Sequence, residues 1–132
     1  MYQHVAHYKR QDIQTATPGK LVVMLYDGAL KHLDLAKSAY EQNDYESKVH
    51  AIGKCRAIVL ELLGALDFDK GGDIAKNLQS VYLYTLGRLR DADMKKDTQA
   101  LLETRHILAD LREAWVTILK KGEPQQMLSQ TG

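Results

Sequence analysis

The stretch Ala16-Thr-Pro-Gly-Lys-Leu-Val-Val-Met-Leu-Tyr-Asp-Gly-Ala-Leu30 decides the fold of this chain. It begins with a helix-start signal, because Thr17 can cap free backbone N–H groups and Pro18 suits the first helical position. The apolar side chains that follow form two stripes on a helix, at about 100° per residue. One stripe holds Leu21, Met24, Leu25 and Gly28, and the other holds Val22, Tyr26, Ala29 and Leu33. Such a helix is either central in a bundle or covered on its second side by something else.

Length and composition limit the possible classes of protein. The 132 residues, 45% hydrophobic and 27% charged, fit one folded domain. A net charge of +1 gives no overall field that would attract nucleic acid or an anionic membrane. The longest apolar run, Leu21–Tyr26, is far shorter than the roughly 20 residues that span a bilayer, so we expect no membrane insertion. The N-terminus has no apolar segment of the signal-peptide type, and Cys55 is the only cysteine, so we expect a cytoplasmic protein.

Four helical segments are predicted, separated by short links. The first runs from about Pro18 to Gln42, and the second begins at an Asn43 cap and runs to about Leu66. The Gly71-Gly72 pair breaks the chain, with Asp69 or Asp73 near the start of a third helix over about 72–92. A fourth helix follows an Asp97 cap and ends near Lys120. The expected apolar faces of the last three helices include Val49, Ile52, Val59, Leu63, Leu66, Ile74, Leu78, Val81, Leu89, Leu101, Leu108, Leu111, Trp115 and Ile118.

Short links favour antiparallel neighbours in a helical protein. The sequence therefore predicts an all-α fold, an antiparallel four-helix bundle (up-down-up-down) over residues 16–121. A mobile N-terminal arm is expected over residues 1–15 and a polar C-terminal tail over residues 122–132.

The reactive side chains do not form the pattern of a catalytic or metal site. No two histidines have His-Glu-x-x-His spacing, and Glu103 with His106 is the only Glu-x-x-His pair, where a di-iron bundle needs two. The acidic stretch 67–73 fails as a calcium loop, because Leu78 stands where a bidentate glutamate is required. Cys55 lies on an apolar face without a histidine partner and is interpreted as a buried thiol. We expect no enzyme, no metal and no cofactor.

More apolar surface remains than a four-helix core needs. A core uses about three positions in seven of each helix, and the first two helices offer more. Extra apolar stripes on a soluble bundle indicate a homo-oligomer interface or a groove for an amphipathic helix. Alternatively, the third and fourth helices cover everything, and periodicity alone leaves these possibilities open.

Three separated motifs resemble one known family. Ala16-Thr-Pro-Gly-Lys-Leu followed by Met24-Leu-Tyr-Asp-Gly-Ala-Leu30 resembles the first helix of FliS, the cytoplasmic flagellin-specific export chaperone. Lys70-Gly-Gly-Asp-Ile-Ala-Lys-Asn-Leu78 looks like that family's third helix, and Leu111-Arg-Glu-Ala-Trp115 resembles a motif near the end of its fourth. Asp73 departs from the pattern, because the family more often has Glu there.

The resemblance implies a function in bacterial flagellum biogenesis. It implies a four-helix chaperone that binds the C-terminal segment of flagellin in apolar grooves, prevents premature polymerisation and assists delivery to the flagellar type III export apparatus. That segment is disordered in the monomer and helical in the filament. A component of the export gate is a further expected partner, and the chain is expected to be a monomer or weak homodimer. The alternative is a helical adaptor or self-associating regulatory bundle whose main partner is another secreted flagellar or regulatory protein.

The resemblance also directs attention to particular residues. The expected flagellin groove consists of Leu21, Leu25, Tyr26, Ile52, Val59, Leu78 and Tyr82. Tyr8 matches the family's arm tyrosine and is expected to cap this groove until the partner displaces it.

Overall fold

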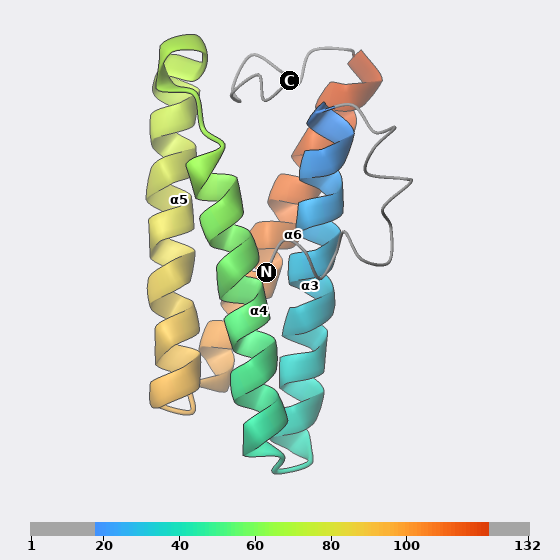
Figure 1. Ribbon diagram of the computed structural model, residues 1–132, viewed down its shortest axis with the longest axis vertical. Helices are drawn as coiled ribbons and strands as arrows, with labels where there is room; N and C mark the ends of the chain where they lie inside the picture. Colours follow the sequence, from blue (N-terminus) through green and yellow to red (C-terminus); the bar gives the residue numbers. More distant parts are fainter. Residues whose placement is uncertain (1–17, 122–132) are drawn as a thin grey trace.

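Residues 18–121 are described by the computed structural model, and they form four helices in an up-down-up-down bundle (Figure 1). The helices are α3 (Pro18–Glu41), α4 (Tyr45–Gly64), α5 (Phe68–Met94) and α6 (Thr98–Lys121). Helices α3 and α5 each pack mainly against α4 and α6, so α3 and α5 are diagonal partners across the core. The all-α four-helix prediction is confirmed. The predicted arm with Tyr8, the Thr17 cap and the predicted tail lie outside the described residues.

The cap of α4 differs from the prediction by one residue. The side chain of Asp44, not Asn43, accepts a hydrogen bond from the backbone N–H of Ser47, at 3.1 Å. Asn43 instead has a φ of 56° and closes the turn, a conformation that asparagine tolerates better than most residues. The predicted Asp97 cap is confirmed, because its side chain accepts a hydrogen bond from the backbone N–H of Ala100 at 3.1 Å.

The predicted glycine break lies inside α5 rather than before it. Asp67 caps the first turn of α5 by accepting hydrogen bonds from two backbone N–H groups, those of Asp69 and Lys70, each at 3.0 Å. Gly72 then has φ 51° and ψ −127°, and this non-helical residue kinks the helix. Glycine adopts that backbone conformation without the steric cost that a Cβ would add.

The core follows a three-four spacing along each helix, as in coiled-coil-like bundles. On α5 the buried positions are Ala75, Leu78, Tyr82, Thr85, Leu89 and Ala92. On α3 the stripe that closes the core contains Val22, Tyr26, Ala29 and Leu33, while Leu21, Met24 and Gly28 remain half-buried. Two residues expected on core faces are exposed, Ile74 by 56% and Val49 by 51%. On α5, Ala75 occupies the core position next to Ile74 and is buried.

Two tyrosines meet at the centre of the bundle. The hydroxyls of Tyr26 on α3 and Tyr82 on α5 lie 2.6 Å apart, and both side chains are buried. Burial raises the pKa of Tyr82 to about 12 and raises the pKa of Tyr26 further, so both hydroxyls keep their protons at neutral pH. One hydroxyl therefore donates to the other, and this hydrogen bond joins the diagonal helices inside the core, where Tyr26 also interacts with the side chain of Trp115.

Replacing either tyrosine by phenylalanine leaves the partner's hydroxyl buried without this hydrogen bond. We expect Tyr26→Phe and Tyr82→Phe each to lower the free energy of unfolding by about 1–2 kcal/mol. The double variant should lose less than the sum of the two, because the hydrogen bond that the two hydroxyls share is lost only once. Urea unfolding of the four proteins measures the coupling; losses that add within about 0.5 kcal/mol would contradict it.

Candidate binding groove between helices α4 and α5

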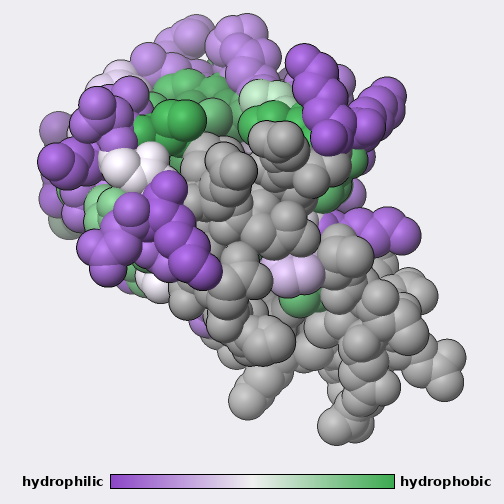
Figure 2. Space-filling model, turned by 90° about the horizontal axis from the view of Figure 1, so that it is seen from above, coloured by the Kyte–Doolittle hydropathy of each residue, from purple (hydrophilic) through white to green (hydrophobic). Residues whose placement is uncertain are grey.

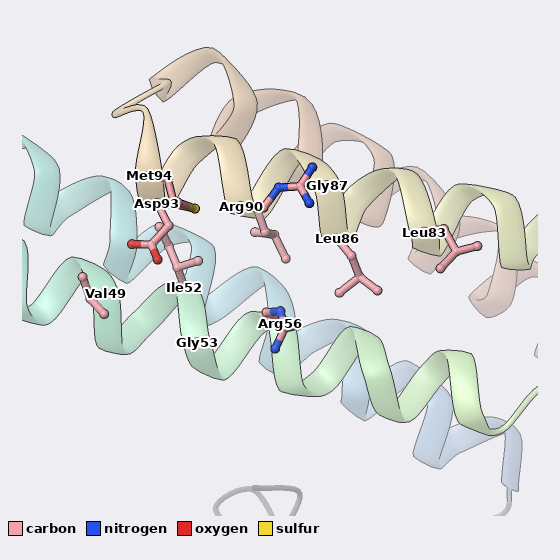
Figure 3. A pocket seen from close by; sticks show the side chains of 11 residues that line it. Val49, Ile52, Gly53, Arg56, Leu83, Leu86, Gly87, Arg90, Asp93 and Met94 are labelled. Carbon is pink, nitrogen blue, oxygen red and sulfur yellow. The ribbon is translucent and has the colours of Figure 1, made fainter.

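An open groove of about 490 Å³ runs between α4 and α5 (Figure 3). This volume falls within the range of roughly 300–1,000 Å³ that is typical of ligand sites. The residues that line the groove come from both helices: Val49, Ile52, Gly53, Arg56, Leu83, Leu86, Gly87, Leu89, Arg90, Asp93 and Met94. Its walls are mainly aliphatic, and its polar groups are two guanidinium groups and one carboxylate.

The groove exists because each helix carries a second apolar stripe beside its core stripe. On α4, Tyr45, Val49, Arg56 and Leu60 are exposed at helical spacing, while the core positions of the same helix face inward. On α5, Leu83 is 53% exposed and Met94 is 74% exposed. Side chains this apolar and this exposed leave the two stripes free to contact another molecule.

Two glycines keep the middle of the groove open. A Cβ added at Gly53 or at Gly87 would meet no other atom within 4 Å, leaving aside their chain neighbours and own helix backbones. Each glycine is followed three residues later by an arginine, Arg56 on α4 and Arg90 on α5. Since the helices are antiparallel, each arginine lies opposite the other helix's glycine (Figure 3). The two arginines therefore border the space that the two glycines leave.

One end of the groove is closed by a polar cluster. The Lys48 ammonium donates to the backbone carbonyl of Asp93 at 2.9 Å and to its carboxylate at 3.1 Å. Lys48 is buried, and its Nζ also lies 5.2 Å from the centre of the Tyr40 ring. The Tyr40 hydroxyl donates to the carbonyl of Ala92. These contacts fix the end of α3, the start of α4 and the end of α5 relative to one another.

Ion pairs link α6 to both of its neighbouring helices. Arg105 of α6 pairs with Asp34 of α3 at 2.7 Å, and Arg112 of α6 pairs with Asp27 of α3. Across the other seam, Arg88 of α5 pairs with Glu103 of α6 at 2.7 Å. Within residues 18–121, the ion pair of Lys48 at the closed end is the one such link between α4 and α5. The seam between α4 and α5 is thus held at one end and open along its middle.

The seven groove residues expected from sequence occupy different places. Leu25, Tyr26, Val59, Leu78 and Tyr82 are buried between the helices. Leu21 is half-buried near the start of α3, and Ile52 is buried on the wall of the groove. Of the seven, only Ile52 lines this groove. A role of the other six in binding stays a prediction, which for the five buried ones would require the bundle to open.

Sequence reasoning missed the rest of the groove, although two signals were present. The Gly-x-x-Arg spacing occurs in both helices, at Gly53 with Arg56 and at Gly87 with Arg90. Glycine is costly inside a helix, so its use at matching places indicates a need for space. Periodicity by itself does not reveal that both glycines line the same groove, because that depends on the register of two helices.

Other surface hollows differ in character. A second one, of about 650 Å³ between α3 and α4, is lined largely by polar residues near their connecting turn. At the opposite end of the bundle, where α3 begins and α6 ends, Figure 2 shows apolar residues gathered between hydrophilic ones. Phe68 and Ile74 are exposed on the first turns of α5. No helix of the described part is long and apolar enough to cross a membrane.

A four-helix bundle with an apolar groove along two helices is a scaffold suited to binding an amphipathic helix. The sequence matches the family model of flagellar protein FliS over residues 1–122, and the chain belongs to the FliS family. It is 38% identical over 115 residues to the flagellar secretion chaperone FliS of Salmonella typhimurium, covering 86% of this chain and 85% of that protein. It is 36% identical over 108 residues to the protein of the same name from Bacillus subtilis, covering 82% and 80% respectively.

The free energy of unfolding of glycine variants tests whether the space above Gly53 and Gly87 is open. Gly53→Ala and Gly87→Ala should each raise the free energy of unfolding by about 0.5–1 kcal/mol, because alanine favours the helix and its methyl group meets no neighbour. Urea unfolding of each variant checks this. A fall in stability would show that the space above these glycines is already filled.

Proposed function

We propose that this chain is a cytoplasmic export chaperone that binds the C-terminal segment of flagellin along the groove between α4 and α5. Its membership of the FliS family supports the function, because the relatives in Salmonella typhimurium and Bacillus subtilis are named flagellar secretion chaperones. The observation that carries the choice of site is the open, aliphatic groove itself. The proposal involves no enzymatic activity and no cofactor.

The chemistry of the groove suits a segment that folds when it binds. The flagellin segment must bury apolar faces against other flagellins in the filament, so a free monomer exposes them. Val49, Ile52, Leu83 and Leu86 offer a matching aliphatic surface. Ordering a disordered segment costs several kcal/mol, which a long contact offsets better than a small pocket. Covering these faces hinders premature polymerisation, and handing the complex to a component of the export gate would complete delivery.

The proposed surface keeps Ile52 and adds the exposed residues beside it. Leu21, half-buried near the start of α3, lies outside this groove and remains a candidate for a longer wrapped contact. Tyr8 remains the proposed cap of the empty groove. The competing proposal is a helical adaptor or self-associating bundle, in which another secreted flagellar or regulatory protein, or a second copy, occupies the same groove.

Filling the groove with side chains should block binding without harming the fold. In the variant Gly53→Leu/Gly87→Leu, two leucines project into the open space, and we expect its affinity for a flagellin C-terminal peptide to fall at least about tenfold. Its thermal stability should equal or exceed that of the wild type. Ala114→Leu, which adds a leucine at an exposed position of α6, is the matched control and should bind normally.

Calorimetric titration with the peptide measures these affinities, and co-purification tests the partner. Flagellin should co-purify with the chain, and flagellin without its C-terminal segment should not. Equal binding of the truncated flagellin would contradict the proposed partner segment. Normal peptide binding by the filled variant would contradict the proposed groove while leaving the function intact. A tight dimer that excludes flagellin would favour self-association.

A further inference from the structure

Arg56 and Arg90 differ from the other arginines that connect the helices. Arg88, Arg105 and Arg112 each form an ion pair with a carboxylate on a neighbouring helix. Within residues 18–121, the side chains of Arg56 and Arg90 have no hydrogen-bond or ion-pair partner. Both are exposed and line the groove, Arg56 on the α4 wall and Arg90 on the α5 wall, where its guanidinium group lies beside Gly87 (Figure 3). The middle of an otherwise aliphatic groove thus carries two positive charges without counter-charges.

The one carboxylate of the groove does not neutralise them. Asp93 is paired with Lys48 at 3.1 Å, so these two residues together add no net charge. An apolar helix laid over the groove would remove water from the two guanidinium groups and leave them unpaired. Covering an unpaired charge is unfavourable, whereas a guanidinium paired with a carboxylate through two parallel hydrogen bonds tolerates the loss of water. The groove therefore discriminates against a helix that carries no acid at this point.

We infer that Arg56 and Arg90 together select an acidic side chain on the bound helix. The occupant is an amphipathic helix whose apolar face covers Val49, Ile52 and Leu86 and whose aspartate or glutamate lies between the two guanidinium groups. The aliphatic walls disfavour nucleic acid or free phosphate as the occupant, because neither would cover them. This inference rests on the proposed function, in which that helix belongs to flagellin.

The length of the groove limits where this acidic residue can lie along the bound helix. The α5 wall extends from Leu83 to Met94, which corresponds to about 17 Å of helix, or three turns. Arg90 lies between these limits. A matching segment therefore has an acid within a three-turn apolar stripe, with aliphatic residues one turn to either side.

A double-mutant cycle across the interface tests the selection. The probes are the C-terminal segment of flagellin from the same organism and the same segment with every Asp and Glu replaced by Asn or Gln. We expect Arg56→Gln/Arg90→Gln to bind the native segment about tenfold more weakly than the wild type does, because an interfacial charge pair is lost. The amide-substituted segment should bind the wild type weakly too, and the arginine substitutions should weaken it no further. Lys31→Gln/Lys37→Gln, at exposed positions of α3, removes the same charge and should leave affinity unchanged.

Each outcome separates the inference from the function on which it rests. If the arginine variant binds the native segment as tightly as the wild type does, the selection of an acid is overturned but the proposed function is not. The same holds if the affinity losses from the arginine and the segment substitutions simply add. The same holds if the lysine control loses as much affinity. No binding of the native segment by the wild type would overturn the proposed function as well. A wild-type dimer in sedimentation that the arginine substitutions dissociate would place a second copy, not flagellin, in the groove.

Discussion

The hydrogen bond between Tyr26 and Tyr82 fixes the diagonal of the bundle. It joins α3 and α5, which are not direct neighbours, through two large side chains that would each be costly to bury alone. Once this distance is set, α4 and α6 must fill the two spaces beside it. Two arginines of α6 pair with α3, and Glu103 of α6 pairs with α5, so α6 closes one side of the molecule. The seam between α4 and α5, by contrast, has an ion pair only at the cluster around Lys48 within residues 18–121.

The open seam between α4 and α5 makes this bundle a candidate binding protein. A bundle in which ion pairs linked the helices at all four seams would present a polar surface on every side. Here the seam between α4 and α5 keeps an aliphatic surface and two glycines in its middle, where the two seams beside α6 have ion pairs. Leaving Arg56 and Arg90 without partners is tolerable while water covers them, and it becomes unfavourable when an apolar helix does. The same two residues are exposed to water in the empty groove, and in the proposed complex they set a requirement for the partner.

The sequence was sufficient to predict the four-helix architecture, but it was not sufficient to predict the groove between α4 and α5. Apolar periodicity and the Asp97 cap predicted four helices with limits close to those observed, except that α5 begins at Phe68, before the Gly71-Gly72 pair. Periodicity also identified two stripes on α3, but it could not decide which one closes the core, because both have helical spacing. Tyr26, Val59 and Tyr82, which were expected in the groove, are buried in the core, as are Ala29 and Ala75, and their role in binding stays a prediction. Which apolar residues remain exposed depends on how the sizes of side chains on different helices match, and one helix examined alone does not contain that information.

Backbone hydrogen exchange in the presence of a flagellin C-terminal segment tests the central claim most directly. Any ligand slows the exchange of amides that open only by global unfolding, so the informative signal is protection beyond this uniform effect. We expect such protection to cover residues 49–56 of α4 and 83–94 of α5, and the facing parts of α3 and α6 to change little. Protection that falls on α3 and α6 and leaves both groove walls unchanged would contradict it.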